Sequence, residues 1–360
     1  MQDILFTSRI YIFGAQSRGK TLKGYLQFLY PQTHILSFLV DCIDGNEAEI
    51  DRIPVWELDS ANGLDSSCSV FIATKGIYQD SIKRRLEERG MKDIIPVTVE
   101  VDNFFRNEYV KKQCLLEHRE FLKISDLQVR KVSAMIYMAE SAYDRPLQTQ
   151  YVCPEYERVI QAGAALTSGL LSAGTLTDCE GDNISARNRQ YCELTVLYWI
   201  WKNAGEDIVG LSHYRRHFIL PEHWQEIMVS NGIDVILPVP TYVYPDIAQN
   251  YKERHDPSDW DYLMEYLREN DPDDYKTAER VFSGNLYLPC NMFVMCREIL
   301  DDLCCWMFPI LDAVAGHGGE KRDTYLNRYP GFISERLITL YFNKYRDKYR
   351  IVYADKNFLG

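Results

Sequence analysis

The sequence lacks long apolar runs, internal repeats and an excess of positive charge. No apolar segment reaches the roughly 18 residues that a membrane-spanning helix needs, so we expect a soluble or at most peripheral protein. The formal net charge is −12, whereas a nucleic-acid-binding protein needs a basic surface that neutralises phosphates. These absences exclude a membrane-spanning protein and argue against nucleic acid as a partner.

Cysteine is present, but it is not arranged for metal binding. The ten cysteines are scattered, without a CxxC pair or a Cys/His spacing typical of zinc sites. Cys304 and Cys305 are adjacent in an apolar helical segment, and we interpret the cysteines as free thiols in a reducing cytosol. The first residues show no pattern of a secretory signal. We therefore expect a cytoplasmic protein that contacts at most the inner face of the cell membrane.

Apolar residues are numerous enough for two folded domains. They make up 46% of the 360 positions, and aromatic residues make up 13%, as is typical of an ordered globular protein. Short apolar segments alternate with amphipathic stretches near the start of the chain, at 8–14, 34–40, 53–58, 69–74 and 93–98. This alternation predicts βαβ units and a parallel sheet, so we assign residues 1–102 to a small Rossmann-like domain.

The rest of the chain is predicted to hold a connector and a second α/β domain. Residues 103–146 are highly charged and are expected to form a helical connector that ends at Asp144-Arg145-Pro146. Residues 147–360 are assigned to the second domain. Its expected strands lie near 207–212, 234–239 and 290–295, and its expected helices near 186–203, 297–314 and 332–346.

A glycine-rich turn follows the first predicted strand. Gly14, Ser17 and Gly19 stand where backbone amides at a helix start could hold the phosphates of a nucleotide. Asp41 ends the second strand and could accept hydrogen bonds from ribose hydroxyls. The spacing is GxxxxG rather than GxGxxG, and the alternative is a sharp turn that needs Gly14 for backbone reasons alone.

Basic side chains end another predicted strand. His213, Arg215 and Arg216 follow the apolar residues Ile208–Leu211, and ligands of open α/β sheets bind beyond the carboxyl ends of strands. A diphosphate is the simplest ligand for two guanidiniums. If the strand continued, His213, Arg215 and His217 would share one face. We predict that His213, Arg215 and Arg216 bind the diphosphate, and the alternative is a solvated strand end.

A resemblance to a known family is carried by GDNISARNRQYCELTVLYWIWKN, followed by IVGLSHYRRHF. These segments resemble the bacterial domain-of-unknown-function family 4422, and the likeness continues through Asn291–Met295 and Gly331–Leu337, over roughly residues 150–346. Members of that family sit in capsular and exopolysaccharide assembly pathways and are regarded as glycosyltransferases. The resemblance implies a fold like the GT-A glycosyltransferases and a nucleotide-sugar donor.

The resulting functional prediction is the transfer of a hexose, such as galactose in pyranose or furanose form, to a glycan or lipid-linked glycan. Many GT-A enzymes hold a divalent metal with a DxD motif at a strand end, where this chain has His213–Arg216. Its literal DxD triplets, at 259–261 and 271–273, lie in acidic helical or loop sequence. We therefore expect fixed cations to replace the metal, with no required cofactor.

Candidate residues for the chemistry itself are fewer. Glu335 and Asp182 are predicted to be catalytic, because an inverting transferase needs a carboxylate that accepts the acceptor proton. Glu335 could instead complement a helix dipole from a first turn, and Asp182 could bind ribose or shape its loop. Asn183 is assigned to the donor site, and Asn291 is expected to bind an acceptor or sugar hydroxyl.

Two other functions compete with sugar transfer. One is an NAD-dependent sugar-nucleotide oxidoreductase or epimerase that uses the N-terminal domain, against which the missing GxGxxG counts. The other is a non-catalytic regulator that binds sugar nucleotides without turnover. The polar strand end is compatible with both binding and catalysis, so the sequence leaves these alternatives open.

Overall fold

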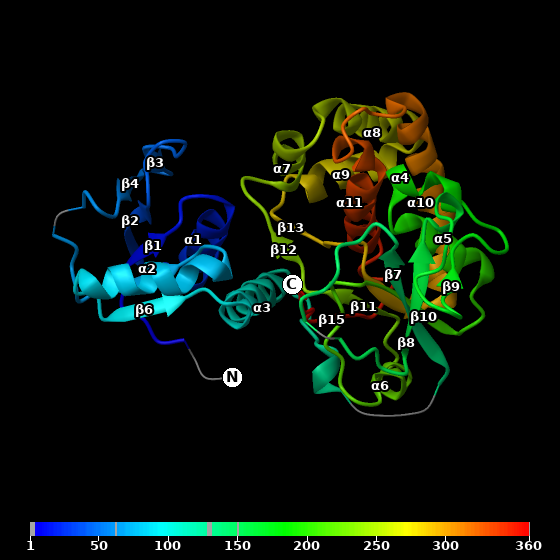
Figure 1. Ribbon diagram of the computed structural model, residues 1–360, viewed down its shortest axis with the longest axis horizontal. Helices are drawn as coiled ribbons and strands as arrows, with labels where there is room; N and C mark the ends of the chain where they lie inside the picture. The colour runs from blue at the N-terminus through cyan, green and yellow to red at the C-terminus, as the bar shows by residue number, and fades with distance from the viewer. Residues whose placement is uncertain (1–3, 62, 128–131, 150, 360) are drawn as a thin grey trace. The chain divides into compact units, whose positions relative to one another are not determined.

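The computed structural model describes residues 4–61, 63–127, 132–149 and 151–359, and it shows an α/β protein (Figure 1). The chain divides into two compact units. The N-terminal unit contains residues 1–120 together with 242–244, and the C-terminal unit contains residues 121–241 and 245–360. Within the described residues, no helix is both long and apolar enough to cross a bilayer.

The N-terminal unit is built on a six-stranded sheet in the order β3-β4-β2-β1-β5-β6. All pairings are parallel except that of β3 with β4. Its elements are β1 (Arg9–Phe13), α1 (Ser17–Leu29), β2 (His34–Val40), β3 (Glu49–Ile50), β4 (Ile53–Glu57), β5 (Ser69–Ile72), α2 (Gly76–Glu88), β6 (Asp93–Pro96) and α3 (Val99–Leu116). The central strands are buried because helices cover both faces of the sheet. The five strands expected here are therefore confirmed.

Helix α3 belongs to this unit and is not part of a separate connector. Its Phe105 ring lies 5.9 Å from the ring of Phe71 on β5, and its Tyr109 ring lies 5.6 Å from that of Tyr25 on α1. These aromatic contacts bury one side of α3 against the sheet and α1. The charged composition that suggested a connector belongs to the exposed side of a packed helix.

The C-terminal unit is built on a seven-stranded mixed sheet in the order β15-β11-β14-β10-β7-β8-β9. Its strands are β7 (Ala134–Ser141), β8 (Glu157–Ala162), β9 (Leu176–Thr177), β10 (Ile208–His213), β11 (Val235–Pro238), β14 (Phe293–Cys296) and β15 (Ile351–Ala354), and the short strands β12 (Thr241–Tyr242) and β13 (Leu286–Tyr287) lie outside this sheet. Its helices are α4 (Asn188–Tyr191), α5 (Leu194–Asn203), α6 (Trp224–Ser230), α7 (Ile247–Arg254), α8 (Pro257–Asn270), α9 (Pro272–Phe282), α10 (Arg297–Gly318) and α11 (Tyr329–Lys344), with short 3₁₀ turns at η1 (Ile124–Asp126), η2 (Ala164–Leu166), η3 (Ser185–Arg187) and η4 (Leu326–Arg328).

Helices pack on both faces of this sheet. Trp224 of α6 is fully buried in a cluster with Ile136 of β7 and Val294 of β14. On the other face, the Tyr137 ring of β7 lies 5.7 Å from the Trp199 ring of α5. Figure 1 shows α5 and α6 on opposite sides of β7 and β10. The alternation of Ile136 and Tyr137 along β7 therefore reflects a strand that is buried on both faces.

The structure corrects three predictions in this unit. The expected connector over 103–146 contains β7, a central strand that pairs with β10 and β8. The single helix expected at 186–203 is broken at Cys192, where φ is +48°. The third expected strand begins at Phe293 rather than at residue 290. The two late helices are confirmed, and all ten cysteines are free, with Cys68, Cys114 and Cys304 buried among them.

The strand order places a switch point between β7 and β10. After β7 the chain moves outward to β8 and β9, and it then returns to the other side of β7 as β10. The carboxyl ends of β7 and β10 therefore flank the position where the order reverses. Such a switch point is where open α/β sheets bind ligands. The antiparallel strand β14 begins at the same edge, because Phe293 pairs with Leu211.

Candidate functional site

Strand β10 ends in a tight turn at this edge of the sheet. The backbone N–H of His213 donates to the carbonyl of Arg216 over 3.0 Å, and the Arg216 N–H donates to the His213 carbonyl over 2.9 Å. The turn ends the strand, so the predicted common face of His213, Arg215 and His217 is wrong. It brings His213 and Arg216 opposite each other instead.

His217 supports this turn from inside the protein. Its ring is buried, and Nδ1 lies 3.0 Å from Oε2 of the equally buried Glu157. The ring stacks on Tyr151 at a centroid distance of 3.7 Å, and the Tyr151 hydroxyl donates to Glu157 over 2.6 Å. Nε2 of His217 lies 3.2 Å from the Tyr214 carbonyl. This network fixes the backbone that carries Arg215 and Arg216.

Arg215 and Arg216 are half-buried, and neither forms an ion pair with a carboxylate of any described residue. Arg215 reaches the Arg145 carbonyl over 3.4 Å, while its buried Nε has no hydrogen-bond partner. Arg216 lies over the Phe358 ring at 5.2 Å. Guanidiniums that are partly desolvated and form no ion pair with a carboxylate are suited to an anionic ligand.

His213 and Glu335 are joined through one backbone unit. Nε2 of His213 lies 2.5 Å from the Cys290 carbonyl oxygen, and the Cys290 N–H donates to Oε1 of Glu335 over 2.5 Å. A carbonyl only accepts, so Nε2 carries a proton in this arrangement. Burial lowers the pKa of His213, against the opposing charge of Glu193, and favours the neutral ring with its lone pair on Nδ1.

Glu335 lies in the second turn of α11, because that helix begins at Tyr329. It is not the first-turn carboxylate that the sequence suggested. Its Oε2 accepts from Arg336 at 2.7 Å, and its Oε1 accepts from Cys290, so both oxygens are engaged. Burial raises the pKa of Glu335, and the charge of Arg336 opposes this rise. The structure places Glu335 beside His213, while its predicted catalytic role stays a prediction.

Asn291 is buried and connects three segments. Its amide nitrogen donates to Oε1 of Glu193 over 2.8 Å and to the Gly331 carbonyl over 3.1 Å. Its amide oxygen accepts from the Ser334 hydroxyl over 2.8 Å. Its φ of +50° is one that asparagine tolerates better than most residues. Contact with a sugar hydroxyl remains a prediction for Asn291, whose observed partners are all protein groups.

Two acidic residues of this edge were not predicted from the sequence to belong to the site. Glu193 stands directly before α5, and its carboxylate accepts a hydrogen bond from the Asn291 amide. Asp144 follows β7 and accepts from the Ser141 N–H over 2.8 Å. Burial raises the pKa of Asp144. The hydrogen bond from the Ser141 N–H, the Tyr214 hydroxyl and the charges of nearby basic residues oppose this rise. Glu193 follows the helix break at Cys192, and Asp144 follows the end of β7. Local periodicity in the sequence indicated neither feature.

Asp182 and Asn183 lie apart from this group. The Asp182 backbone pairs with the Asn203 side chain at the end of α5, and its carboxylate accepts from the Tyr198 hydroxyl over 3.3 Å. Asn203 is adjacent to the start of β10, whereas His213 is its end. Asn183 donates to the carbonyls of Cys179 and Gly181. The structure thus brings neither residue to the edge that holds His213, and it supports the loop-shaping alternative.

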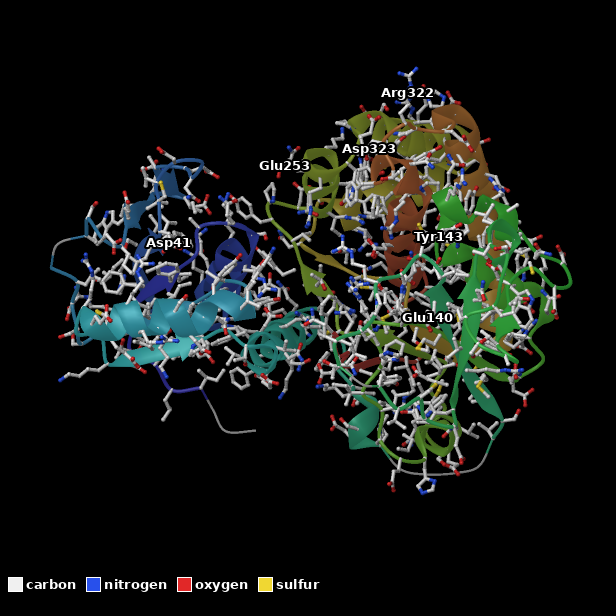
Figure 2. The ribbon with its side chains drawn as sticks, in the orientation of Figure 1. Asp41, Glu140, Tyr143, Glu253, Arg322 and Asp323 are labelled. Carbon is white, nitrogen blue, oxygen red and sulfur yellow. The ribbon has the colours of Figure 1, made fainter. Side chains whose placement is uncertain are left out.

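The N-terminal glycine turn is explained by close packing. Gly14 has a φ of +114°, and a Cβ there would lie 2.8 Å from the Ala73 carbonyl oxygen. A Cβ on Gly19 would overlap the Gly14 carbonyl oxygen. Ser17 is the exposed first residue of α1, and Asp41, labelled in Figure 2, forms an ion pair with Arg85. Nucleotide binding by Gly14, Ser17, Gly19 and Asp41 therefore stays a prediction, and close packing explains both glycines without it.

The DxD triplets lie in helices and have partners. Asp259 and Asp261 of α8 pair with Lys321 at 2.5 Å and with Lys252 at 2.6 Å, respectively. Asp271 accepts from the Asp274 N–H and caps α9, with Asp273 in the first turn. Their carboxylates thus have structural roles in the helical region. Neither triplet occupies the carboxyl end of a described strand.

A cleft of about 530 Å³ opens beside the same strand ends. Glu140 of β7, Val159 of β8 and Tyr214 line it together with residues 147–149. Figure 2 shows Glu140 and Tyr143 where β7 leaves the sheet. Burial raises the pKa of Glu140, with a further rise from Asp144. The cleft provides space next to the basic turn, with both apolar and polar walls.

The loop after β8 is held by one buried carboxylate. Asp178 accepts from the N–H groups of Gly163 and Ala164, over 2.8 and 3.0 Å. It also accepts from the hydroxyls of Ser185 and Thr195, over 2.5 and 2.6 Å. Four donors satisfy a charge that is otherwise costly to bury. Asp178 therefore fixes the loop at the carboxyl end of β8 and links it to α5.

Fold and site together define an α/β protein with basic residues at a topological switch point of its sheet. Its family is shown by a match to the model of Domain of unknown function DUF4422 over residues 147–347, and the chain belongs to that family. The structure is similar to that of the WbbM bifunctional glycosyltransferase in its apo form, with a TM-score of 0.54 and 24% sequence identity. The match covers 63% of this chain and 45% of that chain. No curated protein matches the sequence.

These comparisons confirm two expectations. The family is the one that the residues from Gly181 to Phe218 resembled, and the fold is an α/β fold of glycosyltransferase type. The matched part of WbbM is less than half of that protein, so its bifunctional activity is a property of the longer chain. The likeness at this level of identity concerns the fold, and function has to be argued from the site.

Proposed function

We propose that this protein is a glycosyltransferase that moves a hexose from a nucleoside-diphosphate sugar to a glycan acceptor. The observation that carries the proposal is the pair of guanidiniums of Arg215 and Arg216, without carboxylate partners among the described residues, at the carboxyl edge of β10. That edge lies at the switch point of the sheet, where α/β proteins bind ligands. Membership of DUF4422 and the glycosyltransferase-like fold support the same conclusion.

The chemistry requires charge stabilisation at the leaving group. When the acceptor oxygen attacks the anomeric carbon, the bond between that carbon and the diphosphate oxygen breaks, and negative charge collects on the diphosphate. The turn that His217 supports holds the backbone of Arg215 and Arg216, so both side chains start from this edge before the bond breaks. We expect this transfer to be independent of a metal ion, because basic residues stand where a DxD motif would be.

The finer assignments follow the family resemblance. The donor sugar is proposed to be a hexose such as galactose, in pyranose or furanose form, and the acceptor a glycan or lipid-linked glycan of capsule or exopolysaccharide. Such an acceptor would place the protein in the cytoplasm, at the inner face of the membrane. An NAD-dependent reaction is not supported by a comparable feature, since Asp41 pairs with Arg85 in the N-terminal unit.

A thermal-shift screen tests the proposal. The full chain is heated with a panel of nucleoside-diphosphate sugars and with NAD, each with manganese and with a chelator. A ligand at one hundred times its dissociation constant stabilises the folded state by about 2.7 kcal/mol, which is readily measured. We expect a sugar nucleotide to raise the melting temperature equally in both conditions and to be turned over when alkyl hexosides are added as acceptors.

Two results would contradict this function, and a third would contradict its metal independence. Stabilisation by NAD alone would favour the oxidoreductase, and stabilisation by a sugar nucleotide without any turnover would favour a regulator. A strict requirement for manganese would leave sugar transfer standing but would refute the role of fixed cations in place of a metal.

A further inference from the structure

We propose that Glu193 is the residue that takes the proton from the acceptor hydroxyl, an assignment that rests on the function proposed above. Glu193 was not among the residues that the sequence singled out, and it replaces Glu335 in that role. The carboxylates around His213 differ in what their oxygens already bind.

Of these carboxylates, two are occupied by the protein. Glu335 accepts from the Cys290 N–H with one oxygen and from Arg336 with the other. Asp144 accepts from the Ser141 N–H with Oδ2 over 2.8 Å, and the Tyr214 hydroxyl lies close enough to lower its pKa. A carboxylate that the protein's own donors already engage has less free capacity to bind the hydroxyl of an acceptor.

Glu193 differs because only one of its oxygens is held. Oε1 accepts from the Asn291 amide over 2.8 Å, and no hydrogen bond from a described residue reaches Oε2. The side chain is half-buried, so Oε2 keeps access to a ligand. One oxygen is therefore fixed in position and the other is available, which is the arrangement that a general base needs.

The backbone explains why Glu193 lies at this edge. Cys192 has a φ of +48°, which ends α4 and redirects the chain before α5 begins at Leu194. The Asn188 side chain satisfies the Cys192 carbonyl over 2.7 Å, so the break leaves no unpaired acceptor there. Since α5 runs back along β10 toward its start, the first residues of α5 lie at the carboxyl edge of the sheet.

Asn291 connects this carboxylate to His213. Its amide holds Glu193, the Ser334 hydroxyl holds its amide oxygen, and its neighbour Cys290 contacts His213 through the carbonyl. Cys290 and Asn291 both have positive φ values, of +72° and +50°. A strained pair of residues that is held by four side chains is typical of a functional site. Glu335, which holds the Cys290 N–H, is then a positioning residue.

The acceptor oxygen forms its bond to the anomeric carbon while its proton moves to Oε2 of Glu193. The bond from the anomeric carbon to the diphosphate breaks, and its electron pair leaves with the nucleoside diphosphate beside Arg215 and Arg216. Glu193 ends the step protonated and returns the proton to water. Direct attack of this kind inverts the configuration at the anomeric carbon.

The test compares Glu193→Gln with Glu335→Gln in the full chain. The donor probe is the sugar nucleotide that gives the largest thermal shift, and a mixture of octyl hexosides serves as the acceptor probe. Loss of a general base costs 10²- to 10⁴-fold, so we expect Glu193→Gln to lower kcat about 1000-fold while the donor-induced thermal shift is unchanged. Glu335→Gln is expected to lower the melting temperature, because it leaves Arg336 buried without its counter-charge, and to reduce kcat far less.

The exposed Glu180 supplies the matched control, and Glu180→Gln should leave kcat and the melting temperature unchanged. The residual rate of Glu193→Gln should also lose the acid limb of the pH profile, which a merely structural role would not change. A wild-type kcat in Glu193→Gln, or retention of anomeric configuration in the product, would overturn the assignment but leave the proposed function intact. If the wild type gives neither a thermal shift nor transfer with any probe, the function fails first and the assignment fails with it.

Discussion

The two units each present the carboxyl ends of parallel strands, but they treat charge there in opposite ways. In the N-terminal unit, Arg85 forms ion pairs with Asp41 and Asp59, and Lys20 pairs with Glu47. In the C-terminal unit, Arg215 and Arg216 have no such partner among the described residues. The first edge thus pairs Arg85 and Lys20 with carboxylates, whereas the second leaves Arg215 and Arg216 without such pairs.

The difference shows that a glycine turn after a strand is weaker evidence of a binding site than an unmatched charge. The glycines of the first edge are required by contacts within the protein, since a Cβ at Gly14 or Gly19 would collide with backbone oxygens. At the second edge, no packing requirement explains two adjacent guanidiniums. Function is therefore better inferred from groups whose hydrogen-bonding capacity the fold leaves unused.

The largest expected effect concerns the packing explanation of the first edge. Gly19→Ala should destabilise the N-terminal unit by about 3 kcal/mol, because its new Cβ overlaps the Gly14 carbonyl oxygen and the backbone must shift. The free energy of unfolding, obtained from the first transition in a urea titration, measures this loss. Gly76→Ala is the control, since no heavy atom lies within 4 Å of that Cβ, and its stability should be unchanged or slightly raised. Equal stabilities for Gly19→Ala and Gly76→Ala would show that the turn can accommodate a Cβ at residue 19. Packing would then not explain the glycine, and a role in ligand binding would again be the simpler explanation.

Much of the fold of both units could be predicted from the sequence, but the site could be predicted only in part. The strands of the N-terminal unit follow from apolar segments that turn residues separate, and His213–Arg216 follow from charge at a strand end. Glu193 and Asn291 are 98 positions apart, and their hydrogen bond depends on two backbone breaks with positive φ. Strand β7 was missed because AMIYMAES follows a long charged segment, and Asp144 was therefore taken for a boundary. Contacts of this kind are set by tertiary structure, which local periodicity does not encode.

A second prediction tests the free charge at the C-terminal edge. Arg216→Gln should lower kcat/KM about 100-fold, which corresponds to about 2.7 kcal/mol, because a preorganised donor to the leaving diphosphate is lost. The donor-induced thermal shift should shrink as well, while the melting temperature of the free protein stays within a degree or so, since Arg216 has no internal ion pair.

Arg18→Gln is the matched control in the N-terminal unit, where Arg18 donates to the Thr74 carbonyl over 2.8 Å. We expect its kcat/KM and its donor-induced shift to equal those of the wild type. If Arg18→Gln abolished the donor shift and Arg216→Gln did not, the binding edge would be the wrong one and the comparison would have to be reversed.

The smallest expected effect is a pH dependence that belongs to the C-terminal unit. Burial, together with the charges of Arg336 and Arg254, lowers the pKa of His255 from 6.5 to about 3. The unfolded chain therefore takes up this proton below pH 6.5, whereas the folded protein does not, so stability falls as the pH is lowered from 7 to 5. His255→Phe keeps the stack on Phe332, whose centroid lies 4.1 Å away, and removes the titrating group. The melting temperature of the variant should therefore decrease less than that of the wild type over this interval.

The test uses the difference between His255→Phe and the wild type in how far the melting temperature changes with pH. Burial raises the pKa of carboxyls such as Glu335, and this contribution makes stability rise as the pH falls in both proteins. Scanning calorimetry at pH 7 and pH 5 supplies the difference. His34→Gln, an exposed histidine of the N-terminal unit, should behave like the wild type. Identical pH dependence in His255→Phe and the wild type would mean that His255 takes up its proton in the folded state as well. The stacked ring would then be accessible to water, and the contrast between the two units would rest on Arg215 and Arg216 alone.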